Sequence, residues 1–245
     1  MGCVSMISEH KFAAGYTSFW RTALPLGEPV MRRINSRLSE FASSYDFIAR
    51  PERSALISEV SFRLVALAMD ANRHLGSGDW LWDSISVECA VEAAYAYLSR
   101  LKGAPLMEDR LRKQELQVAV DVAERLRRFF LAEKEGGPLL PLPQFEGCGL
   151  ISSCEGDMMV GTVLYEIKNV DRNFRLTDLR QVITYCALNY VVPRYRITGI
   201  GLVNARSGKF YRIGVEPLAK LISGMSASEL FSNIIDFIST EQVSG

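Results

Sequence analysis

The chain has 245 residues, 28 basic and 28 acidic side chains, a formal net charge of zero and a hydrophobic fraction of 48%. A chain of this length can bury a substantial core. No apolar run approaches the roughly 20 residues that a membrane-spanning helix needs, which excludes a membrane protein of that kind. The first ten residues hold no basic segment followed by an apolar one, so we expect no secretory signal and a cytoplasmic location.

Cysteine, histidine and glycine usage excludes several chemistries. The five cysteines form no C-x-x-C pair, which argues against a disulfide framework and a zinc site. His10 and His74 are far apart, so a histidine metal site, a Ser/His/Asp triad and a Cys/His dyad lack support. The glycines form no G-x-x-x-x-G-K-[ST] phosphate loop.

The first hundred residues show helical periodicity and no catalytic constellation. Helices are predicted at about 29–43, 52–75 and 84–102, with breaks at Pro51, 76–78 and 103–105. We therefore expect residues 1–105 to form an all-helical N-terminal region. It would pack against the remaining domain, residues 106–245, narrow its groove or recruit a protein partner.

Residues 107–134 are interpreted as one helix. At about 100° per residue its apolar side chains form one stripe, and Glu115 projects onto the middle of it. An acid on a buried face needs a compensating partner, so Glu115 is a candidate extra metal ligand or water-orienting group. The alternative is a boundary glutamate paired with an arginine.

Residues 163–170 are rich in β-branched and aromatic side chains and follow Gly161, which predicts a strand after a turn. Charged residues within such a strand cost several kcal/mol per ion unless they are paired or hold a cation. Side chains alternate with period two, which places Leu164, Glu166, Lys168 and Val170 on one face and Tyr165, Ile167 and Asn169 on the other.

Asp157 lies in residues 151–160, which we interpret as one or two short strands turning at Gly161 into the next strand. Such a hairpin brings Asp157 beside Glu166. Two carboxylates without a nearby histidine suit Mg²⁺ or Mn²⁺, and the backbone carbonyl of Ile167 could be a third ligand. The cation would activate a water while Lys168 holds that water or the scissile phosphate, which is the chemistry of phosphodiester hydrolysis.

Asp157, Glu166 and Lys168, followed by Gln181 and Tyr185, resemble the PD-(D/E)xK nuclease superfamily. The similarity is to its RecB-type branch, which carries a Q-x-x-x-Y element on the helix after the E-x-K strand. It covers about residues 107–213 and departs from the pattern before the aspartate, where Gly156 replaces the proline of the family name.

The resemblance implies an α/β protein with a restriction-endonuclease-like αβββαβ core and a Mg²⁺-dependent (or Mn²⁺-dependent) deoxyribonuclease activity. It implies that Gln181 and Tyr185 contact the substrate or shape the site, and it allows an acid, here Glu115, on the helix before the strands. By fold-level analogy, such nucleases belong to bacterial restriction, repair or phage-defence systems.

A basic segment supports a nucleic-acid substrate, with DNA expected. Residues 172–212 hold eight basic residues and one acid, and tyrosines are interleaved with them. Arg175 and Arg180, which flank Gln181, are candidate phosphate contacts. The alternative is a solvated basic face that pairs with the acidic remainder of the molecule.

Downstream, a helix is predicted over about 177–190, strands over 197–203 and 209–215 with a turn at 204–208, and a capping box at Ser226–Glu229 before a helix over 230–238. Two other functions remain open. One is a catalytically silent nuclease-fold module that binds DNA or a partner complex as a scaffold. The other is a helical adaptor whose α/β half is only structural.

Overall fold

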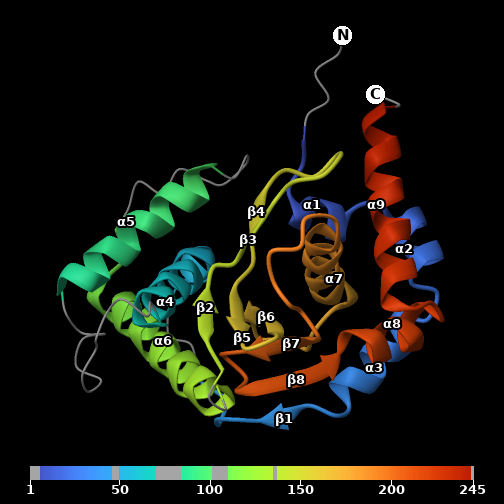
Figure 1. Ribbon diagram of the computed structural model, residues 1–245. Helices are drawn as coiled ribbons and strands as arrows, with labels where there is room; N and C mark the ends of the chain where they lie inside the picture. The colour runs from blue at the N-terminus through green and yellow to red at the C-terminus, as the bar shows by residue number, and fades with distance from the viewer. Residues whose placement is uncertain (1–5, 46–49, 70–83, 101–109, 135–136, 244–245) are drawn as a thin grey trace.

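The computed structural model describes residues 6–45, 50–69, 84–100, 110–134 and 137–243. A six-stranded mixed sheet in the order β1-β8-β7-β6-β5-β2 forms its centre, and β3 and β4 form a separate two-stranded hairpin (Figure 1). The strands are β1 (Ser39–Glu40), β2 (Leu139–Pro141), β3 (Gln144–Phe145), β4 (Cys154–Glu155), β5 (Met158–Val160), β6 (Val163–Lys168), β7 (Gly199–Asn204) and β8 (Lys209–Gly214).

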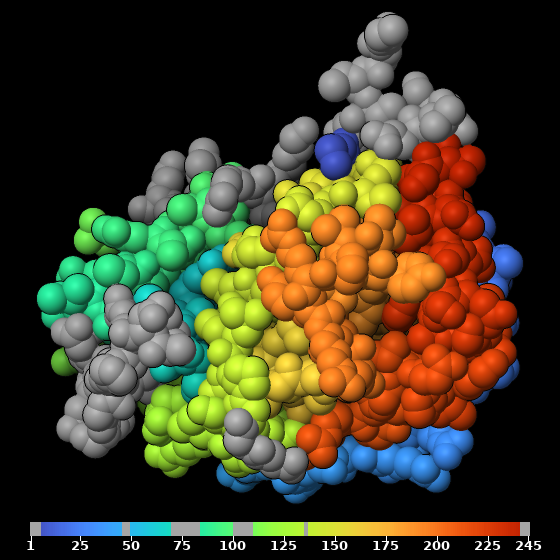
Figure 2. All heavy atoms as spheres, in the orientation of Figure 1, coloured from blue at the N-terminus to red at the C-terminus, as the bar shows by residue number. Residues whose placement is uncertain are grey.

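Helices cover both faces of the sheet, which gives a three-layer α/β arrangement (Figure 1). Figure 2 shows α4, α5 and α6 on one flank of the molecule and α9 on the opposite flank. One layer contains α1 (Glu9–Ala14), α2 (Thr17–Ala23), α3 (Gly27–Asn35), α7 (Leu176–Val191), α8 (Val215–Ser223) and α9 (Ala227–Val243). The other contains α4 (Ser54–Met69), preceded by the 3₁₀ turn η1 (Pro51–Arg53), with α5 (Ser84–Arg100) and α6 (Lys113–Glu133).

Between α6 and α7 the described part of the chain forms five strands, of which β2, β5 and β6 belong to the main sheet. Strand β5 pairs with β2 and with β6 in antiparallel fashion, and α7 carries the chain from β6 to the parallel strand β7. The β3–β4 hairpin is inserted between β2 and β5. The mixed α/β class expected from the sequence is therefore confirmed.

The alternation predicted along β6 is confirmed. Leu164 belongs to the hydrophobic cluster under α7, whereas Tyr165 and Ile167 belong to the cluster under α4 and α6. Gly201 of β7 provides the space that the Tyr165 ring occupies, because a Cβ there would lie 2.2 Å from a ring carbon. Gly161, with φ of +57°, allows the tight turn between β5 and β6.

The N-terminal region differs from the all-helical prediction. The helix predicted over 29–43 ends at Asn35, and Ser39 and Glu40 instead form an edge strand that pairs with β8. Pairing with an available sheet edge overrides the local helical pattern there. Helices α1 and α2 lie in a segment for which the sequence predicted no element.

Other boundaries shift by a few residues. The helix predicted over 107–134 begins at Lys113, and residues 107–109 lie outside the described part of the chain. The capping box before the last helix is confirmed, since Ser226 N–H donates to the Glu229 carboxylate at 2.7 Å. The end of the helix predicted over 52–75 and the breaks at 76–78 and 103–105 also fall outside the described residues.

Residues from both predicted domains build the same two hydrophobic clusters. Helices α1 to α3 pack with α7 to α9, and α4 and α5 pack with α6 and β2. The N-terminal region thus completes both helical layers and adds one strand to the sheet. None of the helices in the described residues combines the length and apolar composition that a bilayer crossing requires.

Candidate active site

Asp157 and Glu166 lie at the open end of the β5–β6 hairpin, opposite its turn. Met158 pairs with Tyr165 in the ladder, so continuing the register by one step places Asp157 opposite Glu166. The Asp157 carboxylate accepts a hydrogen bond from the backbone N–H of Ile167 at 2.6 Å. The Glu166 side chain is 2% exposed. The structure therefore brings together the two acids that the sequence paired.

Lys168 lies two residues beyond Glu166 on the same face of β6 and forms an ion pair with it. Its Nζ lies 2.6 Å from Oε1 of Glu166 and donates to Oε1 of Gln181 at 3.3 Å. Asp178, on the first turn of α7, lies 3.8 Å away and is itself held by Arg172 at 2.8 Å. The ammonium is thus fixed between β6 and α7.

The Gln181 and Tyr185 side chains form one cluster with Glu9 of α1. Nε2 of Gln181 donates to the Tyr185 hydroxyl at 3.0 Å and to Oε1 of Glu9 at 3.4 Å, and the Tyr185 hydroxyl donates to the same Glu9 oxygen at 3.2 Å. All three side chains are buried. Because the Gln181 amide donates toward Glu9, its carbonyl oxygen faces Lys168.

Burial perturbs both carboxylates, and the Asp157 charge adds to the effect on Glu166. Burial raises the pKa of Asp157 to about 6, against the pull of the Lys168 charge. Burial raises the pKa of Glu166 to about 8, opposed by Lys168 and reinforced by the Asp157 charge. Burial alone would lower the pKa of Lys168, but the charges of Glu166, Asp178 and Asp157 raise it. Both carboxyl groups therefore resist ionisation in the folded protein, although Lys168 lies beside them.

One oxygen of this cluster has no partner among the described residues. Oε2 of Glu166 is buried and makes no hydrogen bond with them. An unsatisfied buried carboxylate oxygen beside a second carboxylate fits a divalent cation. The Ile167 carbonyl points to the same strand edge as its N–H, and hence toward Asp157. Asp157, Glu166 and the Ile167 carbonyl thus form a donor set of two side chains and one backbone group.

A larger metal cluster is not present in the part of the chain that the structure describes. No group of three or more His, Cys, Asp or Glu side chains there is placed to hold a metal ion. Glu9 is tied to Tyr185 and Gln181, and Asp178 to Arg172. The predicted donor set, which needs only two side chains, is compatible with this result.

Glu115 lies at the N-terminal end of α6 and binds Arg50. The Arg50 guanidinium donates to both Glu115 oxygens at 2.8 Å, and the Arg112 N–H donates to one of them at 2.8 Å. These hydrogen bonds, Arg50 first, lower the pKa of Glu115 to about 2 despite burial. This is the arginine pairing weighed as the alternative for Glu115, and it occupies both carboxylate oxygens.

The basic segment is largely paired within the molecule. The ion pairs are Arg172–Asp178, Arg194–Glu146, Arg206–Asp171, Lys209–Glu40 and Arg212–Glu133. Arg180 donates to the Ala13 carbonyl at 3.4 Å and lies 5.6 Å from the Trp20 ring centroid, which ties it to α1 and α2. Arg175 is exposed at the start of α7 and makes no ion pair within the described residues.

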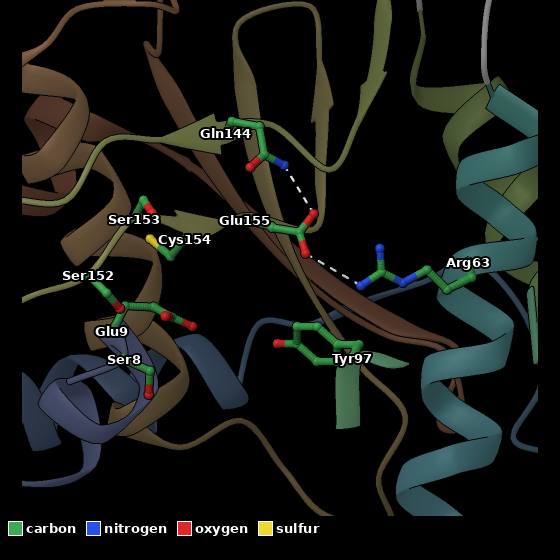
Figure 3. A pocket seen from close by; sticks show the side chains of 9 residues that line it. All are labelled: Ser8, Glu9, Arg63, Tyr97, Gln144, Ser152, Ser153, Cys154 and Glu155. Atoms are coloured by element: carbon green, nitrogen blue, oxygen red, sulfur yellow. Dashed lines mark hydrogen bonds and ion pairs between the residues drawn. The ribbon is translucent and has the colours of Figure 1, made fainter. Parts of the chain in front are cut away.

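A polar pocket adjoins the Glu9 side of the cluster (Figure 3). Its volume is about 550 Å³. The lining residues are Ser8, Glu9, Arg63, Tyr97, Gln144, Ser152, Ser153, Cys154 and Glu155. Burial first, then the charges of Glu59, Glu9 and Asp157, raise the pKa of Tyr97.

Sequence reasoning missed Glu9, Arg63, Tyr97 and Asp178. Asp178 had a detectable local signal, because it is the third residue of α7 and accepts the Arg175 N–H at 2.8 Å as a helix-capping acid does. Glu9, Arg63 and Tyr97 lie within the first hundred residues, where the sequence showed no catalytic constellation. Nothing in their local sequence indicates that they approach residues 144–185.

In comparisons with known proteins, no protein-family model, no curated protein and no solved structure matches this chain.

Proposed function

We propose that this protein is a divalent-cation-dependent nuclease with a restriction-endonuclease-like core, and that it hydrolyses phosphodiester bonds in DNA. The observation that carries the proposal is the pair of carboxylates beside Lys168, buried Glu166 and half-buried Asp157, with one Glu166 oxygen that has no partner among the described residues. The element order from α6 to β7 and the Gln181–Tyr185 pair on α7 support it.

Asp157, Glu166 and the Ile167 carbonyl would hold Mg²⁺ or Mn²⁺. The bound cation would supply Lewis acidity and a lowered pKa for a water molecule. Its charge would also offset the burial that raises the pKa of both carboxyl groups and the Asp157 charge that adds to this effect at Glu166. A hard cation with oxygen donors is the partner that such a site selects, since no histidine or cysteine belongs to the donor set.

Lys168 would bind and orient the reacting group. Its charge is secured by the surrounding carboxylates, so the ammonium can hold an attacking water or a phosphate oxygen. Gln181 accepts from Lys168 and Glu9 accepts from Gln181, so α1 and α7 together fix the direction of the ammonium. Holding a catalytic group in the reacting geometry can account for a large part of an enzyme's rate enhancement.

Cleavage assays test the proposal with wild type, Lys168→Ala and the control Lys220→Ala. The control removes an exposed lysine of α8, a helix that contributes no residue to the candidate site. Linear, circular and single-stranded DNA, with RNA in parallel, would be incubated with Mg²⁺ or Mn²⁺. We expect Lys168→Ala to lose activity by about a hundredfold or more and Lys220→Ala to retain it.

Manganese binding provides a second readout. Calorimetric titration should detect Mn²⁺ binding to wild type and its loss in Asp157→Asn. Equal cleavage by wild type and Lys168→Ala would show a contaminating activity and contradict the proposal. A wild type that binds DNA but cleaves none of the substrates would instead support the silent scaffold.

A further inference from the structure

The polar pocket beside the site shares a wall with it. Glu9 lines the pocket, and the same carboxylate accepts the hydrogen bonds from Tyr185 and Gln181. In Figure 3 the Glu9 carboxylate and the Tyr97 hydroxyl both point toward the space between them. A group bound in this pocket would lie next to the residues that orient Lys168.

The charge of the pocket disfavours a phosphate. Among the described residues that line it, Arg63 is the one cationic side chain, and it is paired with Glu59 at 2.7 Å and with Glu155 at 3.4 Å. The Glu9 and Glu155 carboxylates both line the pocket, so these described lining residues carry a net negative charge. A ligand that brings neutral N–H donors suits these walls better than an anion does.

The pocket walls also include an aromatic ring and a side-chain amide. Tyr97 contributes an aromatic ring that the Arg63 guanidinium covers at 5.1 Å, and Gln144 contributes a side-chain amide held by Glu155 at 3.0 Å. A volume of about 550 Å³ lies in the range of pockets that enclose a small flat ligand. Aromatic rings stack on unpaired bases whatever their sequence, and carboxylates accept from exocyclic amino groups.

We propose that this pocket binds an unpaired nucleobase of the substrate strand, and that Glu9 selects bases carrying an amino group over thymine. The proposal rests on the proposed function for the identity of the ligand as nucleic acid. Because a base within a duplex cannot enter a pocket, the site would act on a strand that is single-stranded at this position. Tyr97 would supply stacking and Glu9 the hydrogen-bond acceptor.

Binding measurements test this with short single-stranded oligonucleotides of equal length, oligo-dC and oligo-dT, in Ca²⁺ to limit turnover. We expect wild type to bind oligo-dC about tenfold more tightly. Tyr97→Ala should weaken binding of both by about tenfold, whereas Tyr97→Phe should retain it. Glu9→Gln should bring the two affinities together. Ile85→Ala, at an exposed position near the other end of α5, is the matched control and should change neither.

The outcomes separate this inference from the proposed function. Selective binding of oligo-dC without cleavage would count against the nuclease and support the pocket. Cleavage by wild type with equal affinity for both oligonucleotides, or with unchanged binding in Tyr97→Ala, would overturn the pocket alone.

Discussion

The Tyr185 hydroxyl donates a hydrogen bond to the Glu9 carboxylate across 3.2 Å, although 176 residues separate the two in sequence. The bond joins α1 to the helix that carries Gln181, and Gln181 in turn contacts Lys168. A short N-terminal helix is therefore part of the candidate site. Its contribution can be measured apart from any activity.

Removing the Tyr185 hydroxyl should weaken the fold. Tyr185→Phe leaves the buried Glu9 carboxylate with one donor fewer. We therefore expect the free energy of unfolding of this variant to be lower than that of wild type by about 2 kcal/mol. Urea denaturation of Tyr185→Phe, Glu9→Gln and the double variant gives a coupling energy, which should exceed about 0.5 kcal/mol. Tyr190→Phe, at an exposed position, should be neutral. Additive effects would contradict a direct bond.

Removing one partner of the buried Glu166–Lys168 pair should destabilise the fold more than replacing both partners. Lys168→Met leaves Glu166 buried and unpaired, and we expect a loss of roughly 3 kcal/mol in unfolding free energy measured with a chelator present. The double variant Glu166→Leu/Lys168→Met should recover most of that loss. If the double variant is as unstable as the single one, packing and not charge governs this position.

The raised carboxyl pKa values predict an unusual pH dependence of stability without divalent cations. The ordinary pKa values of 3.8 for Asp157 and 4.5 for Glu166 rise to about 6 and about 8 in the folded protein. Between these limits the folded state binds more protons than the unfolded state, so the free energy of unfolding should fall as pH rises from about 4 to about 8. Unfolding curves across this range measure it.

Saturating Mg²⁺ should remove that decline, because a bound cation lowers both pKa values, and Glu166→Gln should flatten it without a metal. The lowered pKa of Glu115 acts below pH 4.5 and does not interfere. A free energy of unfolding that rises steadily across the range in a chelator would contradict the raised pKa values of the two acids.

Glu115 should prove to be a structural residue. Its stabilising pair with Arg50 is fully present above pH 4.5 and is lost as pH falls toward 2. Glu115→Gln should therefore lower the melting temperature near neutral pH, with a difference from wild type that shrinks in acid. Mn²⁺ binding should persist. Glu92→Gln, an exposed acid of α5, is the control; loss of Mn²⁺ binding in Glu115→Gln alone would place Glu115 in the metal site.

The local geometry of the strand, hairpin and helix at the candidate site could be predicted from the sequence. Period-two alternation placed Glu166 and Lys168 on one face of β6, and the turn at Gly161 placed Asp157 opposite Glu166. The helical spacing of Gln181 and Tyr185 placed both on one side of α7. These relationships involve residues within about thirty positions, where the geometry of a strand, hairpin or helix fixes the separation.

Long-range partners were outside the reach of such reasoning. The pairing of Arg50 with Glu115, the edge strand at Ser39–Glu40 and the internal ion pairs of the basic segment each depend on how separate elements dock. Periodicity predicts which face of an element is buried but not which other element covers it.

The sequence by itself determined the strand, hairpin and helix that assemble Asp157, Glu166, Lys168, Gln181 and Tyr185, because backbone periodicity dictates which neighbouring side chains share a face. Only the tertiary structure decided that Glu9 completes this cluster, that Glu115 is held by Arg50, and that a polar pocket opens beside them. Those contacts arise when whole layers pack on the sheet, and the free energy of that packing is spread over residues far from the site.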